Sequence, residues 1–168
     1  MSTSIVGLHH VTAIASDPQR NLDFYTQVLG LRFVKRTINF DDPGTYHFYF
    51  GNDVGAPGTI LTFFPWPHVN KGRIGAGEVI ATAFSVPVGS LNFWVERLKT
   101  KGISSTEGVR FGSQVITFRD PDGMVLELME HEEKQASPAS RYSEIEANHA
   151  IQGFYGVTLL ERSLRFFI

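Results

Sequence analysis

Two adjacent histidines near the start of the chain are the first residues that could do chemistry. His9 and His10 lie in the stretch GLHHVTAIA, whose apolar and β-branched residues are typical of a strand. Because neighbouring side chains of a strand point to opposite faces, only one of the two imidazoles is expected to face a given cavity. An inward histidine with Thr12 on the same face could bind iron, manganese or zinc, since neutral imidazole suits all three. The alternative is a hydrogen-bonded core histidine beside a solvated one.

A single carboxylate, Glu127, stands in the apolar run MVLELM. Burying a lone carboxylate costs free energy unless it is paired or bound to a cation. Glu127 is therefore a second candidate metal ligand. The alternatives are that its face of the strand is partly wet, or that Arg110 or Arg119 pairs with it.

The other polar residues carry weaker signals. His47 lies among aromatic residues in YHFYF and is expected to pack or to donate from a pocket wall. Three more histidines fall in connectors and are expected in solvent: His68, His131 and His149. The glycine-rich stretches lack the strand-to-helix context of a phosphate loop, and no serine has a G-x-S-x-G setting, so nucleotide binding and serine hydrolysis have little support.

The elements that must position these residues follow one order, β-α-β-β-β, which occurs twice. The first copy is expected to have strands over 5–15, 31–40, 45–51 and 59–65, with a helix from Pro18 to Leu29 that Asp17 caps. The second is expected to have strands over 78–86, 103–111, 113–119 and 124–130, with a helix that ends at Gly102. Pro18 precedes LDFY by four positions and Pro87 precedes LNFW by four, which indicates an internal repeat and an α+β fold class.

A third copy begins near the end of the sequence. GFYGVTLL at 153–160 matches GLHHVTAI at 7–14, with glycine, valine and threonine in register. The expected organisation is a first module over 5–65, a connector over 66–77, a second module over 78–130, a polar linker over 131–148 and the start of a third module over 149–168.

The composition of the chain limits the kinds of partner that the protein can bind. The chain has 168 residues, no cysteine and a net charge of −2 from 15 basic and 17 acidic residues. These values exclude a thiolate metal site and a cysteine nucleophile, and they leave no basic surface for nucleic acid or an anionic membrane. No apolar run approaches the roughly 20 residues of a membrane-spanning helix. We expect a soluble, cytoplasmic protein with a small-molecule partner.

Taken together, the tandem repeat, the first-strand histidine and the DPDG turn leading to Glu127 resemble the vicinal oxygen chelate superfamily of glyoxalases, bleomycin-resistance proteins and extradiol dioxygenases. The resemblance is closest to the N-terminal half of its ring-cleaving hydroquinone dioxygenase branch. It is carried by GLHHVT at 7–12, VLGLRFVKRT at 28–37, YHFYF at 46–50, PGTILTFFP at 57–65 and RFG at 110–112. Members of that branch are about twice as long, with four modules.

The resemblance implies βαβββ modules that form a curled mixed sheet around a metal held by two imidazoles and one carboxylate. It implies Fe(II), with Mn(II) as the alternative, and a hydroquinone or catechol-like aromatic substrate that is opened with O₂. By position, His10 and Glu127 are the implied metal ligands, and His9 and Thr12 are catalytic pocket residues that orient substrate or relay a proton.

Two ligands on one chain bind iron poorly unless water or another subunit, as in a homo-oligomer, completes the set. The branch takes its second histidine and its glutamate from a fourth module that this sequence does not contain. The chain is then an incomplete dioxygenase. The alternative is a bleomycin-resistance-type protein that holds a planar ligand in a groove of Tyr49, Phe63, Phe64 and Trp66 without catalysis.

Overall fold

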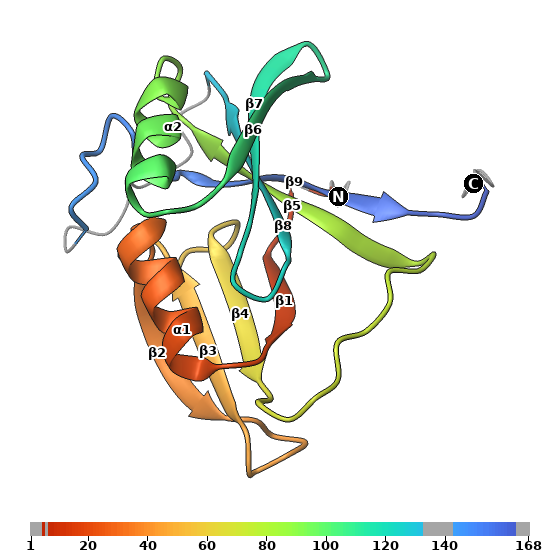
Figure 1. The fold of residues 1–168 in the computed structure, drawn as a ribbon. Helices are drawn as coiled ribbons and strands as arrows, with labels where there is room; N and C mark the ends of the chain where they lie inside the picture. Colours follow the sequence, from red (N-terminus) through yellow and green to blue (C-terminus); the bar gives the residue numbers. More distant parts are fainter. Residues whose placement is uncertain (1–4, 6, 133–142, 164–168) are drawn as a thin grey trace, which may run out of the picture.

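The structure is a computed structural model that describes residues 5, 7–132 and 143–163 (Figure 1). The first module contains β1 (His10–Ala15), α1 (Pro18–Asp23), a π-helical turn η1 (Phe24–Val28), β2 (Arg32–Ile38), β3 (Tyr46–Gly51) and β4 (Ile60–Pro65). The second contains β5 (Glu78–Val86), α2 (Leu91–Thr100), β6 (Ser105–Arg110), β7 (Ser113–Arg119) and β8 (Val125–Glu130). One more strand, β9 (Gly153–Leu160), follows. The predicted β-α-β-β-β repeat and the α+β class are confirmed.

Two mixed sheets carry the fold. The first module forms a sheet in the order β1-β4-β3-β2, and the second forms β6-β7-β8-β5-β9. In each module the first and last strands pair in parallel, β1 with β4 and β5 with β8. The start of the predicted third copy becomes β9, which pairs antiparallel to β5 at the edge of the second sheet.

The first helix and the first strand have other boundaries than the sequence predicted. The Asp17 side chain accepts a hydrogen bond from the Arg20 amide at 2.7 Å, as expected of an N-cap, and the helix begins at Pro18. Its second half, however, widens into η1 before Gly30, whose φ of 70° turns the chain out of the helix. The first strand starts at His10 rather than residue 5, after Gly7 with a φ of 149°.

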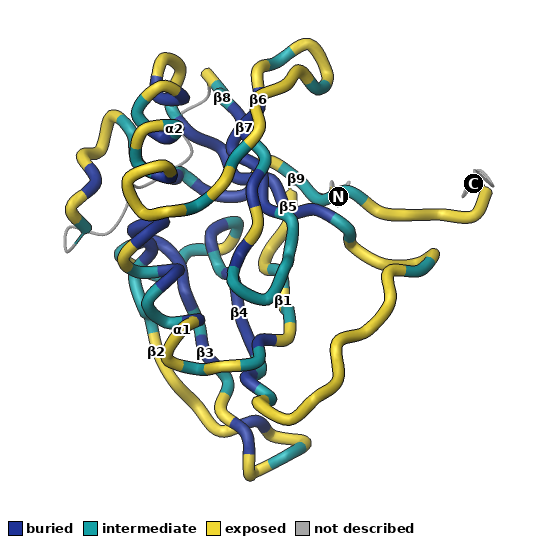
Figure 2. Tube along the Cα trace, in the orientation of Figure 1, coloured by how far each residue is buried: buried dark blue, intermediate teal, exposed yellow. Residues whose placement is uncertain are grey.

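Both helices pack on the same side of the two sheets, and the buried positions lie mainly along the strands and helix faces between them (Figures 1 and 2). One core cluster joins the modules, and it includes Tyr25 and Trp94 from the two helical regions. Ile145, within the predicted linker, is also buried in this core, so the described end of that segment packs between the modules. The rest of the linker that was predicted, residues 133–142, lies outside the described residues. Among the described helices, neither has the length and apolar composition required to cross a membrane.

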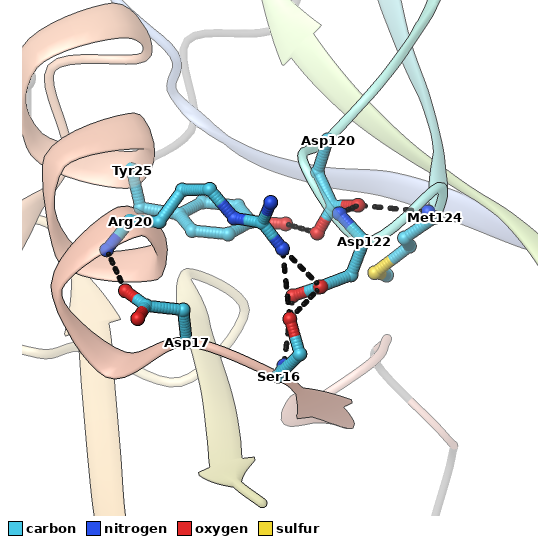
Figure 3. A network of polar contacts seen from close by, with 7 residues as sticks. All are labelled: Ser16, Asp17, Arg20, Tyr25, Asp120, Asp122 and Met124. Carbon is cyan, nitrogen blue, oxygen red and sulfur yellow. Dashed lines mark hydrogen bonds and ion pairs between the residues drawn. The ribbon is translucent and has the colours of Figure 1, made fainter. Parts of the chain in front are cut away.

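A polar network fastens the first helix to the DPDG turn of the second module (Figure 3). Asp122 accepts hydrogen bonds from the amide and hydroxyl of Ser16, and it forms an ion pair with Arg20 at 2.9 Å. In the same network, the buried Tyr25 hydroxyl donates to Asp120 at 3.0 Å. The turn that leads into β8 is thereby held against the first module.

A second polar contact joins the modules, from an arginine of the second module to the backbone of the first. Arg97 of α2 donates to the backbone carbonyls of Gln27 and Val28 at 2.7 and 2.8 Å. These carbonyls lie at the end of η1, where the helical hydrogen-bond ladder stops and acceptors need partners. Burial lowers the pKa of Arg97.

Candidate functional site

His9 and His10 lie side by side in the structure. Their Nδ1 atoms are 3.1 Å apart, and the two rings meet edge to face with centroids 5.2 Å apart. The prediction that they point to opposite faces is therefore wrong. His9 precedes β1, in an irregular segment whose carbonyl accepts a bond from the Gly58 amide at 2.8 Å, so the alternation of a strand does not apply to it. Both side chains are exposed.

Thr12 follows His10 on the same face of β1, two residues along the strand. It lies opposite Thr62 of β4, and the buried Thr62 hydroxyl donates to the Thr12 hydroxyl at 2.9 Å. This contact orients the exposed Thr12 side chain. The structure thus brings His9, His10 and Thr12 together at one edge of the first sheet.

A hollow of about 500 Å³ adjoins these residues. Leu8 and His9 form part of its wall, loop 56–59 forms another, and Gln152, Phe154 and Tyr155 close it from the start of β9. The side-chain oxygen Oε1 of Gln152 is buried and has no hydrogen-bond partner among the described residues. An unpaired buried acceptor costs free energy, so the Gln152 amide is a strained part of this wall.

Sequence reasoning missed Gln152 and Tyr155 because the third copy was interpreted only as an incomplete module. The signal was nevertheless present. When Gly153 is aligned with Gly7, Tyr155 falls at the position of His9, and both side chains line the same hollow.

Aromatic side chains cover the face of the first sheet that carries His10 and Thr12, on the strands beyond β1. The His47 ring lies 4.1 Å from the Phe64 ring, and Trp66 stacks on Phe64 at 5.9 Å. The Tyr49 hydroxyl and His47 Nδ1 are 2.8 Å apart. Burial, and then the positive charges of Lys35 and His10, lower the pKa of His47.

Phe63, which was predicted to line this aromatic surface, is fully buried on the other side of the sheet, 4.7 Å from the Tyr25 ring. The correction follows from the period of two along β4, which sends Phe63 and Phe64 to opposite faces.

Glu127 lies in the second sheet and is only 5% exposed. Its carboxylate forms an ion pair with Arg110, whose guanidinium also donates to the Thr158 hydroxyl of β9 at 3.1 Å. Of the alternatives for Glu127, the arginine pair is what the structure contains. Its role as a metal ligand stays a prediction, and it would compete with Arg110.

The two candidate metal ligands, His10 and Glu127, lie in different sheets. Within residues 5, 7–132 and 143–163, no three histidine, aspartate or glutamate side chains cluster closely enough to hold a metal ion. His10 offers an accessible imidazole, but Glu127 is engaged elsewhere and does not complete a set with it. The described residues therefore do not fit a whole metal centre.

Comparison with known proteins places the chain in a family. Residues 7–128 match the model of the Glyoxalase/Bleomycin resistance protein/Dioxygenase superfamily, and the chain belongs to it. The fold is the vicinal oxygen chelate fold that the sequence predicted.

Individual relatives show which members of the superfamily the chain is similar to. The chain is 51% identical over 160 residues to "Putative ring-cleaving dioxygenase MhqO" of Bacillus subtilis, covering 95% of this chain and 51% of that protein. It is 37% identical over 132 residues to the chlorohydroquinone/hydroquinone 1,2-dioxygenase of Sphingobium indicum, covering 76% of this chain and 41% of that protein. A crystal structure of a "putative dioxygenase" from Bacillus subtilis superposes with a TM-score of 0.90 at 50% identity, covering 95% of this chain and 51% of the other. The chain thus spans about half the length of these relatives.

Proposed function

We propose that this chain forms half of a ring-cleaving dioxygenase that opens hydroquinone or catechol-like aromatics with O₂. The observation that carries the proposal is the His9–His10 pair beside a hollow of about 500 Å³. Pockets of this size suit small ligands, and this one combines apolar walls with few polar groups. The names of the relatives, including a hydroquinone dioxygenase, agree with an aromatic substrate. The cytoplasmic location stays a prediction.

His10 is proposed as a metal ligand, for Fe(II) with Mn(II) as the alternative. Its Nδ1 is occupied by His9, which leaves Nε2 as the nitrogen available for a metal. Water, a second copy in a homo-oligomer or a further part of a longer protein would then supply the remaining ligands. Glu127 can be one of these metal ligands only if its ion pair with Arg110 breaks.

His9 and Thr12 are proposed to orient substrate and to move a proton. Two Nδ1 atoms 3.1 Å apart share one hydrogen, so if His10 carries it, His9 accepts at Nδ1 and bears its own proton on Nε2. This arrangement fixes the tautomer of both rings, as a neighbouring acceptor does for metal-bound histidines elsewhere. His9 Nε2 can then donate to a substrate oxygen in the hollow.

The test compares His10→Ala, His9→Ala and the loop control His68→Ala after anaerobic loading with Fe(II) and desalting. We expect His10→Ala to lose bound iron at least tenfold, and the other two to retain the wild-type amount. Oxygen uptake with hydroquinone should disappear in His10→Ala and fall strongly in His9→Ala. Equal iron content in the two adjacent histidine variants would remove the ligand assignment, and a wild-type chain that binds no iron would remove the metal from this chain altogether.

The second candidate is a binding protein without catalysis, and the absence of a complete metal centre among the described residues favours it. The exposed part of the stack of His47, Phe64 and Trp66 could hold a planar aromatic molecule. Saturable binding of hydroquinone in the presence of EDTA, weakened by Trp66→Ala and unchanged by His10→Ala, would favour this function over the first.

A further inference from the structure

The Arg110–Glu127–Thr158 contacts show that the second sheet curls around a guanidinium. Arg110 belongs to β6 and Thr158 to β9, which are the two opposite edge strands of the five-stranded sheet. Adjacent strands are about 4.8 Å apart, so a flat sheet would separate these edges by far more than an arginine side chain can reach. The hydrogen bond of 3.1 Å between them therefore requires a strongly curved sheet. Glu127, on β8 between the two edges, pairs with the same guanidinium.

Small or apolar side chains adjoin Glu127 toward β5 and along its own strand, and Thr117 of β7 lies opposite it on the other side. Glu127 lies opposite Ala83 of β5, and Ala83 lies in turn opposite Gly156 of β9. Ala83 packs with Val115 and Met129 in a buried cluster on the same side of the sheet. A carboxylate in such surroundings needs a compensating positive charge. Arginine suits this role because it keeps its charge at every accessible pH and presents several donors in a fixed plane.

We propose that Arg110 supplies, inside the second module, the positive charge that a metal ion would otherwise supply to Glu127. Arg110 and Glu127 are positioning residues, and their joint role is to anchor β9 to the second module. The carboxylate that the sequence singled out as a metal ligand is thus a structural partner of the guanidinium. Thr158 lies on β9, three residues beyond Tyr155, so the anchor acts on the same strand that closes the hollow beside His9.

The experiment is a thermal-unfolding cycle of Arg110→Met, Glu127→Gln and the double variant, performed in EDTA. Arg110→Met leaves a buried carboxylate without its partner, so the melting temperature should fall by about 10 °C. Glu127→Gln should lower it less, because the side chain of Arg110 is 31% exposed and can reach water. The double variant should melt no lower than Arg110→Met alone. Arg119→Ala, on the neighbouring strand and bonded only to the Gly123 carbonyl in the described structure, is the matched control and should change little.

Iron content provides the second readout. Glu127→Gln should retain the same bound iron as the wild type after anaerobic loading, whereas a true ligand would lose it at least tenfold. Additive effects in the unfolding cycle, or loss of iron in Glu127→Gln, would overturn the inference. If the wild-type chain binds no iron, the proposed dioxygenase site fails on its own, and the unfolding cycle in EDTA still decides between a coupled pair and two independent residues.

Discussion

Burial of Tyr25, which is hydrogen-bonded to Asp120, makes the protein less stable at alkaline pH. Tyr25 has no exposed surface, and burial first, then the negative charge of Asp120, raises its pKa well above its usual value. In the unfolded chain a tyrosine ionises near pH 10. Above that pH the unfolded state loses a proton that the folded state retains, so the free energy of unfolding falls as pH rises. The perturbation that isolates this effect is Tyr25→Phe.

The magnitude follows from two terms. At pH 7 the variant loses one hydrogen bond to a carboxyl group, worth about 2 kcal/mol, while Asp120 keeps its bonds from the amides of Asp122 and Met124 at 2.9 and 2.8 Å. Above pH 10 the wild type loses up to about 1.4 kcal/mol per pH unit that phenylalanine cannot lose. The difference between the two proteins should therefore shrink from about 2 kcal/mol at pH 7 to about zero near pH 11.5.

Urea unfolding at intervals from pH 7 to pH 11.5 measures this convergence, since ionisations common to both proteins cancel in the difference. As a control, Tyr46→Phe removes the same hydroxyl from a side chain that is 47% exposed, and its free energy of unfolding should differ little from that of the wild type. A Tyr25→Phe difference that is constant between pH 9 and pH 11.5 would refute the reasoning, because it would mean that the folded state does not retain the Tyr25 proton.

Two further predictions concern the contacts between the modules. Arg97→Met keeps the aliphatic stem but leaves two carbonyls at the end of η1 without donors, so the free energy of unfolding should fall by about 2 kcal/mol in urea titrations; an unchanged value would show that water replaces the guanidinium. Gly30→Ala should destabilise by about 3 kcal/mol, because a Cβ there would lie 2.3 Å from Ser143 Oγ and the φ of 70° is itself unfavourable for alanine. Gly89→Ala has a similar φ of 86° and open space, so it should cost only about 1–2 kcal/mol, and equal effects at the two glycines would contradict the steric argument.

The fold was predictable because its signals are local and occur twice. The spacing of Pro18 and Pro87 before their helices reveals the repeat, and period-two patterns locate the strands between turns. The widening of the first helix into η1 was not predictable in the same way. Phe24, Tyr25 and Val28 of η1 are buried in the core, as the apolar stripe indicated, but no local sequence pattern marks the change from an α-helical to a π-helical turn. The burial of Ile145 likewise comes from packing between modules, within a stretch whose composition indicates a linker.

The candidate site was predictable in residue type and less so in geometry. His9, His10 and Thr12 do lie together, but their mutual orientation depends on where β1 begins, and that boundary is set by Gly7 and the bond to loop 56–59. Glu127 was recognised as a buried carboxylate that needs a partner. Which partner it takes depends on the curvature of the whole second sheet, because Arg110 lies 17 positions away and also reaches β9.

The two modules have the same element order but leave different chemistry on their corresponding surfaces. In the first, the accessible imidazole of His10 and the hydroxyl of Thr12 face outward, with no arginine bound to either in the described structure. In the second, the only buried carboxylate of the last strand is already neutralised by Arg110. A ligand or metal that approaches Glu127 in the second module must displace the Arg110 guanidinium, whereas one that approaches the first module meets groups that are exposed and oriented. The proposed reaction is therefore expected beside β1, and the second module contributes β9 and its pocket residues to the hollow there.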